Sequence, residues 1–555
     1  MKKCFILHST FLLVLTFTTN TVPPLMSDLP FERSYEETRL PQFLTDIYGS
    51  IKQTINDFGT TLSSLPENIY NSLFPSKPYQ NEIAHLRYSP TDELCSQEQE
   101  YVSKRLENVQ KYLEETFNIK LDKNKIPRIA CCFSGGGFRS MITTFGFLNG
   151  AQRSGALDAT LYLAGLSGST WAIAPWIASG KSLPDYFEPL SIDLDDGIKQ
   201  IMGLSRLKQL MKLFIHKMLY KQMVTSIDIY GGLLANTLLT HASDNPLHLT
   251  MSESHQYIMN GSLPMPIYTA IQSNLEPYEW VEFTPFEVGS SYLKSYVPTW
   301  AFGRKFKEGI STNSAPEQTL GFYLGVCGSA FEVNLQDVIR MTADNIAQVK
   351  SELPSFIYEP LKKCILLIIN SIIGEARLFP AMLANFSYLH SESPIKDEKN
   401  MTLVDAGIDF NLPFPPLLRK TRSVDVIIVY DASASVSGAP ELYLAEKYAQ
   451  RKGIKFPHIN YEGIDQKPIS IFKDDNDVET PIIIYFPRIK NCNYDPHFDP
   501  DYCVSEDYCN TFNFAYSKEQ VKQLCGLAEF TVINQHEVIQ NTIKEVLVNK
   551  YGYQI

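Results

Sequence analysis

The sequence has no excess of positive charge, because 49 lysine and arginine residues are outnumbered by 61 acidic ones. The formal net charge of −12 argues against nucleic acid as a partner and against simple electrostatic docking on anionic lipid. It does not argue against contact with a membrane surface through apolar side chains.

Cysteine and histidine residues with the spacing of a metal site are also absent. Four of the ten cysteines gather near the C-terminus, at Cys492, Cys503, Cys509 and Cys525. Their spacing does not match a zinc ribbon and no histidine pair completes one, so no metal and no cofactor are predicted. If the chain is exported, these four residues are candidates for disulfide bonds.

Long hydrophobic runs are missing beyond the N-terminus, so we predict no membrane span there. At the N-terminus, Lys2 and Lys3 precede a short apolar run, CFILHSTFLLVLTF, which is typical of a signal peptide. We therefore expect a signal peptide at 1–22, a turn-rich extension at 23–90 and the main domain at 91–555, with export of the mature protein. The alternatives are an uncleaved anchor or a buried N-terminal helix, and a cytoplasmic protein that associates peripherally with membranes.

The stretch 128–180 contains two tight turns that follow predicted strands. Ile129–Phe133 and Leu161–Leu166 are apolar runs typical of strands buried on both faces. Three glycines at 135–137 follow the first strand and leave backbone amides pointing outward at a helix start. Ser167 follows the second strand within GLSGS, a nucleophile-elbow pattern whose last serine replaces the second glycine. Two such turns at one end of adjacent parallel strands fit an acyl-transfer site, with the nucleophile in one and oxyanion donors in the other.

An acid, Asp405, ends a later strand-like segment, TLVD. A carboxylate at a strand end lies where open α/β sheets carry their ligands and can accept a serine proton directly, although a turn-capping role is the alternative. His458 and His536 remain open as members of a triad, but pairing Ser167 with Asp405 is simpler. The segment 378–399 before this motif is a candidate mobile lid or a plain surface connection.

Three motifs carry a resemblance to a known family: SGGGFRSM at 134–141, GLSGSTW at 165–171 and VDAGIDFNLPFPPLLR at 404–419. With them the chain resembles the catalytic domain of the group IV cytosolic phospholipase A2 and fungal phospholipase B family, which is related more distantly to patatin. The likeness runs in order through 94–490. It implies a three-layer α/β/α, patatin-like fold with a central, mostly parallel sheet and a helical cap or lid, and it makes 91–555 the catalytic domain.

The resemblance also implies roles for single residues. Ser167 would be the nucleophile, and Asp405 would be the base that takes its proton. The amides of Gly136 and Gly137 would form the oxyanion hole. Arg139 would hold the substrate phosphate as a bidentate donor.

By the same resemblance, Arg422 would be a second arginine that supports Arg139 in binding the substrate phosphate, and a surface ion pair is the alternative for it. The expected activity is that of a phospholipase A2 or lysophospholipase that works without calcium or another metal on a phospholipid membrane or micelle. An acyltransferase or broad esterase with the same dyad is one alternative, and a catalytically silent lipid-binding protein is another. No calcium-binding C2-type β-sandwich is expected, because the stretch before Leu94 is short and turn-rich.

Overall fold

The computed structural model describes residues 77–195, 204–330 and 380–555, with isolated positions elsewhere. The predicted signal peptide at 1–22 and most of the predicted extension therefore lie outside the part that is described. All described residues fall within one compact unit, Phe43–Ile555.

A twelve-stranded mixed sheet forms the centre of this unit, in the order β1-β7-β6-β5-β4-β3-β2-β12-β14-β13, with β11 paired to β4 and β10 to β11. Its strands are β1 Arg87–Tyr88, β2 Ile129–Phe133, β3 Thr160–Leu166, β4 Met265–Gln272, β5 Glu279–Phe283, β6 Glu287–Ser290, β7 Ser295–Pro298, β10 Ala381–Ala384, β11 Asn400–Asp405, β12 Val426–Asp431, β13 Ser470–Phe472 and β14 Ile482–Pro487. The five middle strands, β4, β3, β2, β12 and β14, run parallel, and the outer pairs are antiparallel. A separate two-stranded ribbon joins β8 Phe306–Lys307 to β9 Ile310–Ser311.

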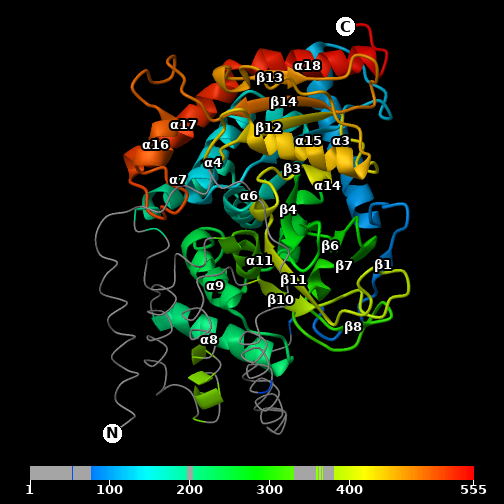
Figure 1. Cartoon of the computed structure of the whole chain (residues 1–555), viewed down its shortest axis with the longest axis vertical. Helices are drawn as coiled ribbons and strands as arrows, with labels where there is room; N and C mark the ends of the chain where they lie inside the picture. The colour runs from blue at the N-terminus through cyan, green and yellow to red at the C-terminus, as the bar shows by residue number, and fades with distance from the viewer. Residues whose placement is uncertain are drawn as a thin grey trace, which may run out of the picture. The chain divides into compact units, whose positions relative to one another are not determined.

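Helices cover the sheet. They are α3 Ser96–Phe117, α4 Gly137–Arg153, α5 Ala156–Ala159, α6 Gly168–Ser179, α7 Leu183–Asp193, α8 Leu204–Leu219, α9 Ser226–Leu238, α10 His255–Ile258, α11 Leu320–Cys327, α14 Phe414–Leu417, α15 Pro440–Lys452, α16 Pro500–Glu506, α17 Lys518–Asn534 and α18 His536–Asn549. α4 packs against α6 and α17, while α3 packs against β3 and α5. Figure 1 shows α4, α6, α7 and α17 to the left of the central strands and α3, α14 and α15 to the right. The sheet between helices is the α/β/α fold that the resemblance implied.

The strands predicted around the two turns are confirmed. Every residue of β2 and of β3 is buried, as expected for parallel strands that are covered on both faces by helices. The helix predicted after the glycine turn is α4, and the turn at Ser167 leads into α6. No helix among the described residues has both the length and the apolar character of a membrane span.

The structure adds detail at two edges of the domain. In the described part of the predicted lid, Ala381–Ala384 forms β10, which pairs with β11. Its residues alternate between buried and half-buried, as is typical of an edge strand. The side-chain amide of Asn385 then donates to the carbonyl oxygens of Ile395 and Glu398, both at 2.8 Å, and closes the following loop. At the other edge, Arg87–Tyr88 pairs with β7 as β1, so the sheet includes residues that the sequence assigned to the extension.

Candidate active site

Ser167 lies at the turn between β3 and α6, with φ of 51° and ψ of −120°. A positive φ is rare for a residue with a side chain, and this strained turn is the conformation of a nucleophile elbow. Gly168 allows the turn to approach the glycine turn that follows β2, because a Cβ on Gly168 would lie 2.1 Å from the carbonyl oxygen of Gly137. The two predicted turns therefore touch, as an acyl-transfer site requires.

Ser169 ties the ends of the two strands together. Its hydroxyl oxygen accepts from the backbone N–H of Leu166 at 2.9 Å and lies 2.9 Å from the carbonyl oxygen of Phe133, to which it can donate. The serine that replaces the second glycine of the elbow pattern thus connects β3 to β2. The sequence indicated only that this residue is small enough for the turn.

Asp405 reaches Ser167 because β4 has two successive neighbours on one edge. β3 pairs with β4 as far as the pair Leu166–Thr269, and β11 takes over, antiparallel, with the pair Asp405–Ala270. Adjacent residues of β4 therefore lie opposite the C-terminal ends of both strands. The hydroxyl of Ser167 donates to Oδ2 of Asp405 at 2.8 Å, although the two residues are 238 positions apart.

The carboxyl of Asp405 is buried and held on several sides. Oδ1 accepts from the backbone N–H of Gly407 at 3.0 Å, and the backbone N–H of Asp405 donates to the hydroxyl of Ser329 at 2.9 Å. Burial raises the pKa of Asp405 from 3.8 to about 7, against the opposing effect of the hydrogen bonds from Gly407, Ser167 and the backbone of Ala330. A carboxylate with a pKa near 7 is a stronger base than an exposed one, which suits proton transfer from a serine.

The glycine turn presents its amides beside the elbow. Gly136 and Gly137 have φ of 138° and 63°, and Gly137 begins α4, so their amides lie where the helix dipole favours negative charge. Asn411 fixes the preceding residue, because its side chain accepts from the N–H of Gly135 and donates to the carbonyl oxygen of Gly135, both at 3.1 Å. The turn is thus held from outside in a conformation that can accommodate an oxyanion.

Arg139 lies next to this turn and is buried. Its Nε donates to the carbonyl oxygen of Ala432 at 3.0 Å, and its Nη1 donates to the carbonyl oxygen of Cys509 at 2.8 Å and to the hydroxyl of Thr511 at 2.9 Å. Its Nη2 points toward the glycine turn, since a Cβ on Gly136 would lie 2.4 Å from that atom. Burial lowers the pKa of Arg139 to about 9, so the guanidinium stays charged at neutral pH.

Comparison with known proteins places this geometry in a family. The model of the lysophospholipase catalytic domain matches residues 129–451, which is more than half of the chain and contains both turns and Asp405. The chain belongs to the lysophospholipase catalytic domain family. A curated relative, cytosolic phospholipase A2 zeta of Mus musculus, is 27% identical over 542 residues; the match covers 82% of this chain and 62% of the relative. The chain thus spans about three fifths of the length of that member of the family.

Two solved structures have the same fold as this chain. Human GIVD cytosolic phospholipase A2 superposes with a TM-score of 0.70 at 21% identity, over 84% of this chain and 69% of that one. The same human protein in complex with methyl gamma-linolenyl fluorophosphonate gives a TM-score of 0.65 at 22% identity, over 85% and 66% of the two chains. At such low identity these matches establish the fold alone.

Arg422 does not have the environment that the resemblance implied. Its guanidinium is fully buried, and its five N–H groups donate to Glu98, Glu282 and the carbonyl oxygen of Pro416 at 2.8–3.2 Å. No donor is left for a substrate phosphate. The expectation that Arg422 binds phosphate is therefore corrected, and so is the alternative of a surface ion pair, because this ion pair is buried.

The histidines that remained open for a triad do not contact Ser167. His458 is exposed, and Nδ1 of His536 is hydrogen-bonded to the carbonyl oxygen of Ile533 at 2.9 Å. Among the described residues, one group of potential metal ligands converges, formed by Cys95, Glu98 and Glu287. Glu98 and Glu287 accept hydrogen bonds from Arg422 and Arg87. These arginines supply the positive charge that a metal would otherwise bring, so the group does not fit a cation site.

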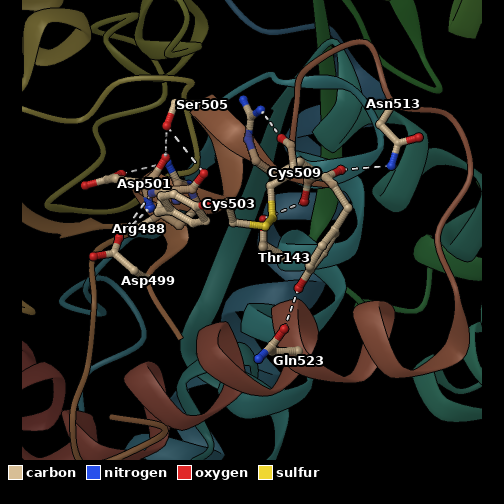
Figure 2. The surroundings of a disulfide bond; sticks show 12 residues. Thr143, Arg488, Asp499, Asp501, Cys503, Ser505, Cys509, Asn513 and Gln523 are labelled. Atoms are coloured by element: carbon tan, nitrogen blue, oxygen red, sulfur yellow. Dashed lines mark hydrogen bonds and ion pairs between the residues drawn. A yellow bond between two sulfur atoms is a disulfide. The ribbon is translucent and has the colours of Figure 1, made fainter. Parts of the chain in front are cut away.

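The C-terminal cysteines form one disulfide. Cys503 and Cys509 are bonded, whereas Cys492 is an exposed free thiol and Cys525 a half-buried one. Figure 2 shows the disulfide with the ion pair of Arg488 and Asp501 on one side and Asn513 on the other. Two of the four cysteines that the sequence singled out thus close a short loop.

Sequence reasoning missed three residues that orient the site: Ser169, Ser329 and Asn411. Ser169 and Asn411 lie inside the recognised motifs. The only local signal of Ser169 was its small size, and the only signal of Asn411 was a polar side chain next to a turn that contains aspartate. Ser329 had no signal, because its contact with Asp405 joins segments that are 76 positions apart.

Proposed function

We propose that the chain hydrolyses fatty-acyl esters of glycerophospholipids, as a phospholipase A2 or lysophospholipase, through the dyad of Ser167 and Asp405. The single observation that carries the proposal is the 2.8 Å hydrogen bond from the Ser167 hydroxyl to the buried Asp405 carboxyl. Family membership supports a lipid ester as the substrate. The activity of the whole protein is part of the proposal, since the chain matches 62% of its curated relative.

The proposed reaction proceeds in two half-reactions. Asp405 takes the proton of Ser167 while the serine oxygen bonds to the ester carbonyl carbon, and the amides of Gly136 and Gly137 stabilise the oxyanion. The bond to the lysophospholipid oxygen then breaks, and that oxygen takes the proton from Asp405. Water attacks the acyl-enzyme in the same manner, with Asp405 as base, and releases the fatty acid. Nη2 of Arg139 is proposed to bind the substrate phosphate.

The test is hydrolysis of a mixed-acyl phosphatidylcholine in EDTA by the wild type, Ser167→Ala and Asp405→Asn, with identification of the released fatty acid. We expect the wild type to be active and both variants to fall to background, because each lacks one half of the dyad. Ser191→Ala, which changes a serine on α7 whose hydroxyl is hydrogen-bonded at the surface, serves as the matched control. Activity that survives in Ser167→Ala would contradict the proposal.

The same hydrolysis assay, together with labelling of the active site, distinguishes the hydrolase from its alternatives. If an added alcohol captures most of the acyl group, the chain is an acyltransferase or broad esterase with the same dyad. A fluorophosphonate probe should label Ser167 in the folded wild type, as the human relative in complex with such a compound suggests. Failure to label Ser167 would favour a silent lipid-binding protein.

The proposed partner is the surface of a phospholipid membrane or micelle. The compartment in which the protein works is also part of the proposal. The names of the relatives contain the word cytosolic, which supports the cytoplasmic alternative with peripheral membrane association. Export remains a prediction from residues 1–22, and the absence of a C2-type module remains a prediction as well. N-terminal sequencing of the mature protein tests export, because a cleaved signal peptide removes the first residues.

A further inference from the structure

A disulfide-closed loop holds one edge of Arg139. Residues 503–511, which we call the clasp, begin in α16 and contact Arg139 in the first turn of α4. The carbonyl oxygen of Cys509 and the hydroxyl of Thr511 both accept from Nη1 of Arg139. The disulfide joins the clasp at Cys503 and Cys509, and the N–H of Cys509 also donates to the carbonyl oxygen of Cys503 at 3.0 Å.

The clasp determines which part of the guanidinium faces the site. Both hydrogens of Nη1 are used by the clasp, and the hydrogen of Nε is used by the carbonyl oxygen of Ala432. Because the guanidinium is planar, these three bonds fix its orientation and leave the two hydrogens of Nη2 toward Gly136. Without the clasp acceptors, Nη1 would lose both partners in a buried setting and the plane would be free to rotate.

Contacts outside the loop hold the clasp in place. Asp501 in α16 pairs with Arg488 at 3.1 Å, and the hydroxyl of Tyr508 donates to the side chain of Gln523 in α17 at 2.6 Å. Figure 2 shows Arg488, Asp501 and Gln523 around the disulfide. Arg488 also repels Arg139, which makes the acceptors of the clasp more important for keeping Arg139 in place. The disulfide is the covalent part of this support.

We propose that the clasp is a positioning element for Arg139, and that the redox state of Cys503 and Cys509 sets the preference of the site for phosphate-bearing esters. This proposal rests on the proposed function, in which Arg139 binds the substrate phosphate. A dithiol such as dithiothreitol breaks the S–S bond and is itself oxidised to a cyclic disulfide, while Cys503 and Cys509 become two protonated thiols. The reduced clasp then holds Arg139 less firmly, and phosphate binding weakens.

The experiment compares two esters on the same protein preparations. One is phosphatidylcholine, and the other is p-nitrophenyl butyrate, which uses the dyad but has no phosphate. The readout is the ratio of kcat/KM for the two esters, since loss of folded enzyme lowers both values equally. We expect Thr511→Val to lower this ratio about tenfold, because one hydrogen bond to a charged group is lost, and Thr511→Ser to restore it.

Reduction of the wild type provides a second, independent measurement. Dithiothreitol should lower the ratio in the wild type but have no effect on the Cys503→Ser, Cys509→Ser double variant, whose ratio should already be low. Cys492→Ser is the matched control, because it removes an exposed free thiol and should respond to dithiothreitol like the wild type. Alkylation and mass spectrometry report the state of each thiol, and labelling of Ser167 by a fluorophosphonate reports the folded site.

The outcomes separate the two proposals. A ratio that is unchanged by both Thr511→Val and reduction, or values for both esters that fall together, would overturn the role of the clasp in an otherwise active phospholipase. If the oxidised wild type labels at Ser167 and cleaves p-nitrophenyl butyrate but not phosphatidylcholine, the proposed function fails and the clasp proposal fails with it.

Discussion

Replacing Asp405 by asparagine removes a charge from the interior of the site and should stabilise the fold while abolishing activity. Burial raises the pKa of this carboxyl from 3.8 to about 7, even though it accepts hydrogen bonds from Gly407 and Ser167. A rise of that size lowers the free energy of unfolding by about 4 kcal/mol once the carboxyl is ionised. Asparagine keeps an acceptor for Gly407 and places an amide donor beside Ser167, but it carries no charge.

The sign of the effect sets the pH range of the assay. Because the folded-state pKa lies above the unfolded one, the stability associated with the neutral carboxyl is fully present below 3.8 and is lost as the pH rises through about 7. The free energies of unfolding of wild type and Asp405→Asn should therefore be similar near pH 4 and differ by up to about 4 kcal/mol near pH 8, with the variant more stable. Urea unfolding followed by tryptophan fluorescence at several pH values measures this difference.

Ser167→Ala is the matched control for this prediction. It also abolishes hydrolysis, but it keeps the buried carboxyl and removes a hydrogen bond that favours its charged form. Its stability should therefore depend on pH at least as strongly as that of the wild type. Stability profiles of wild type and Asp405→Asn that run parallel between about pH 4 and 8 would refute the reasoning, because they would mean that Asp405 does not titrate in that range.

Three further outcomes are expected. The kcat/KM for phospholipid should rise with pH and level off above about 7, as the proposed base loses its proton; a flat profile from about pH 5 to 8 would exclude a base with this pKa. Gly168→Ala should prevent the close approach of the two turns, because the new Cβ would lie 2.1 Å from the carbonyl oxygen of Gly137. The variant should therefore either unfold or fold with an unreactive Ser167. Circular dichroism measures the folding and fluorophosphonate labelling measures the reactivity. Arg422→Met should lower the free energy of unfolding by about 3–5 kcal/mol, because Glu98 and Glu282 lose their shared partner in the interior. In urea unfolding, a loss below about 1 kcal/mol would contradict that estimate.

The sequence predicted those parts of the site whose signal is local. Ser167 and the three glycines each follow a short, fully apolar strand, and a turn between such a strand and a helix has few conformations available. Asp405 was predicted from a strand ending in an acid. Its approach to Ser167 was a hypothesis, which the antiparallel placement of β11 on β4 now explains; the sequence indicated only that the acid lies at a strand end.

The parts that the sequence did not predict depend on contacts between distant segments. Arg422 lies just beyond the last motif, in a basic and polar run, and nothing near it reveals that Glu98, 324 positions away, accepts its hydrogen bonds in the interior. The orientation of Arg139 depends in the same way on Cys509 and Thr511, which lie in a segment that the motifs do not reach. Burial of a charged side chain is decided by its partners, and residue spacing carries no information about partners in other segments.

The topology of β4 also explains why this site can work without a histidine. In a triad the imidazole ring spans the distance between acid and serine, so the acid has some freedom in where its strand ends. In a dyad no third side chain fills that distance, and the two strand ends must meet in register. The edge of β4 meets that requirement, because Thr269 pairs with Leu166 and the next residue, Ala270, pairs with Asp405. The same close placement buries the carboxyl and raises its pKa to about 7, so one feature of the sheet provides both the geometry and the basicity of the proposed base.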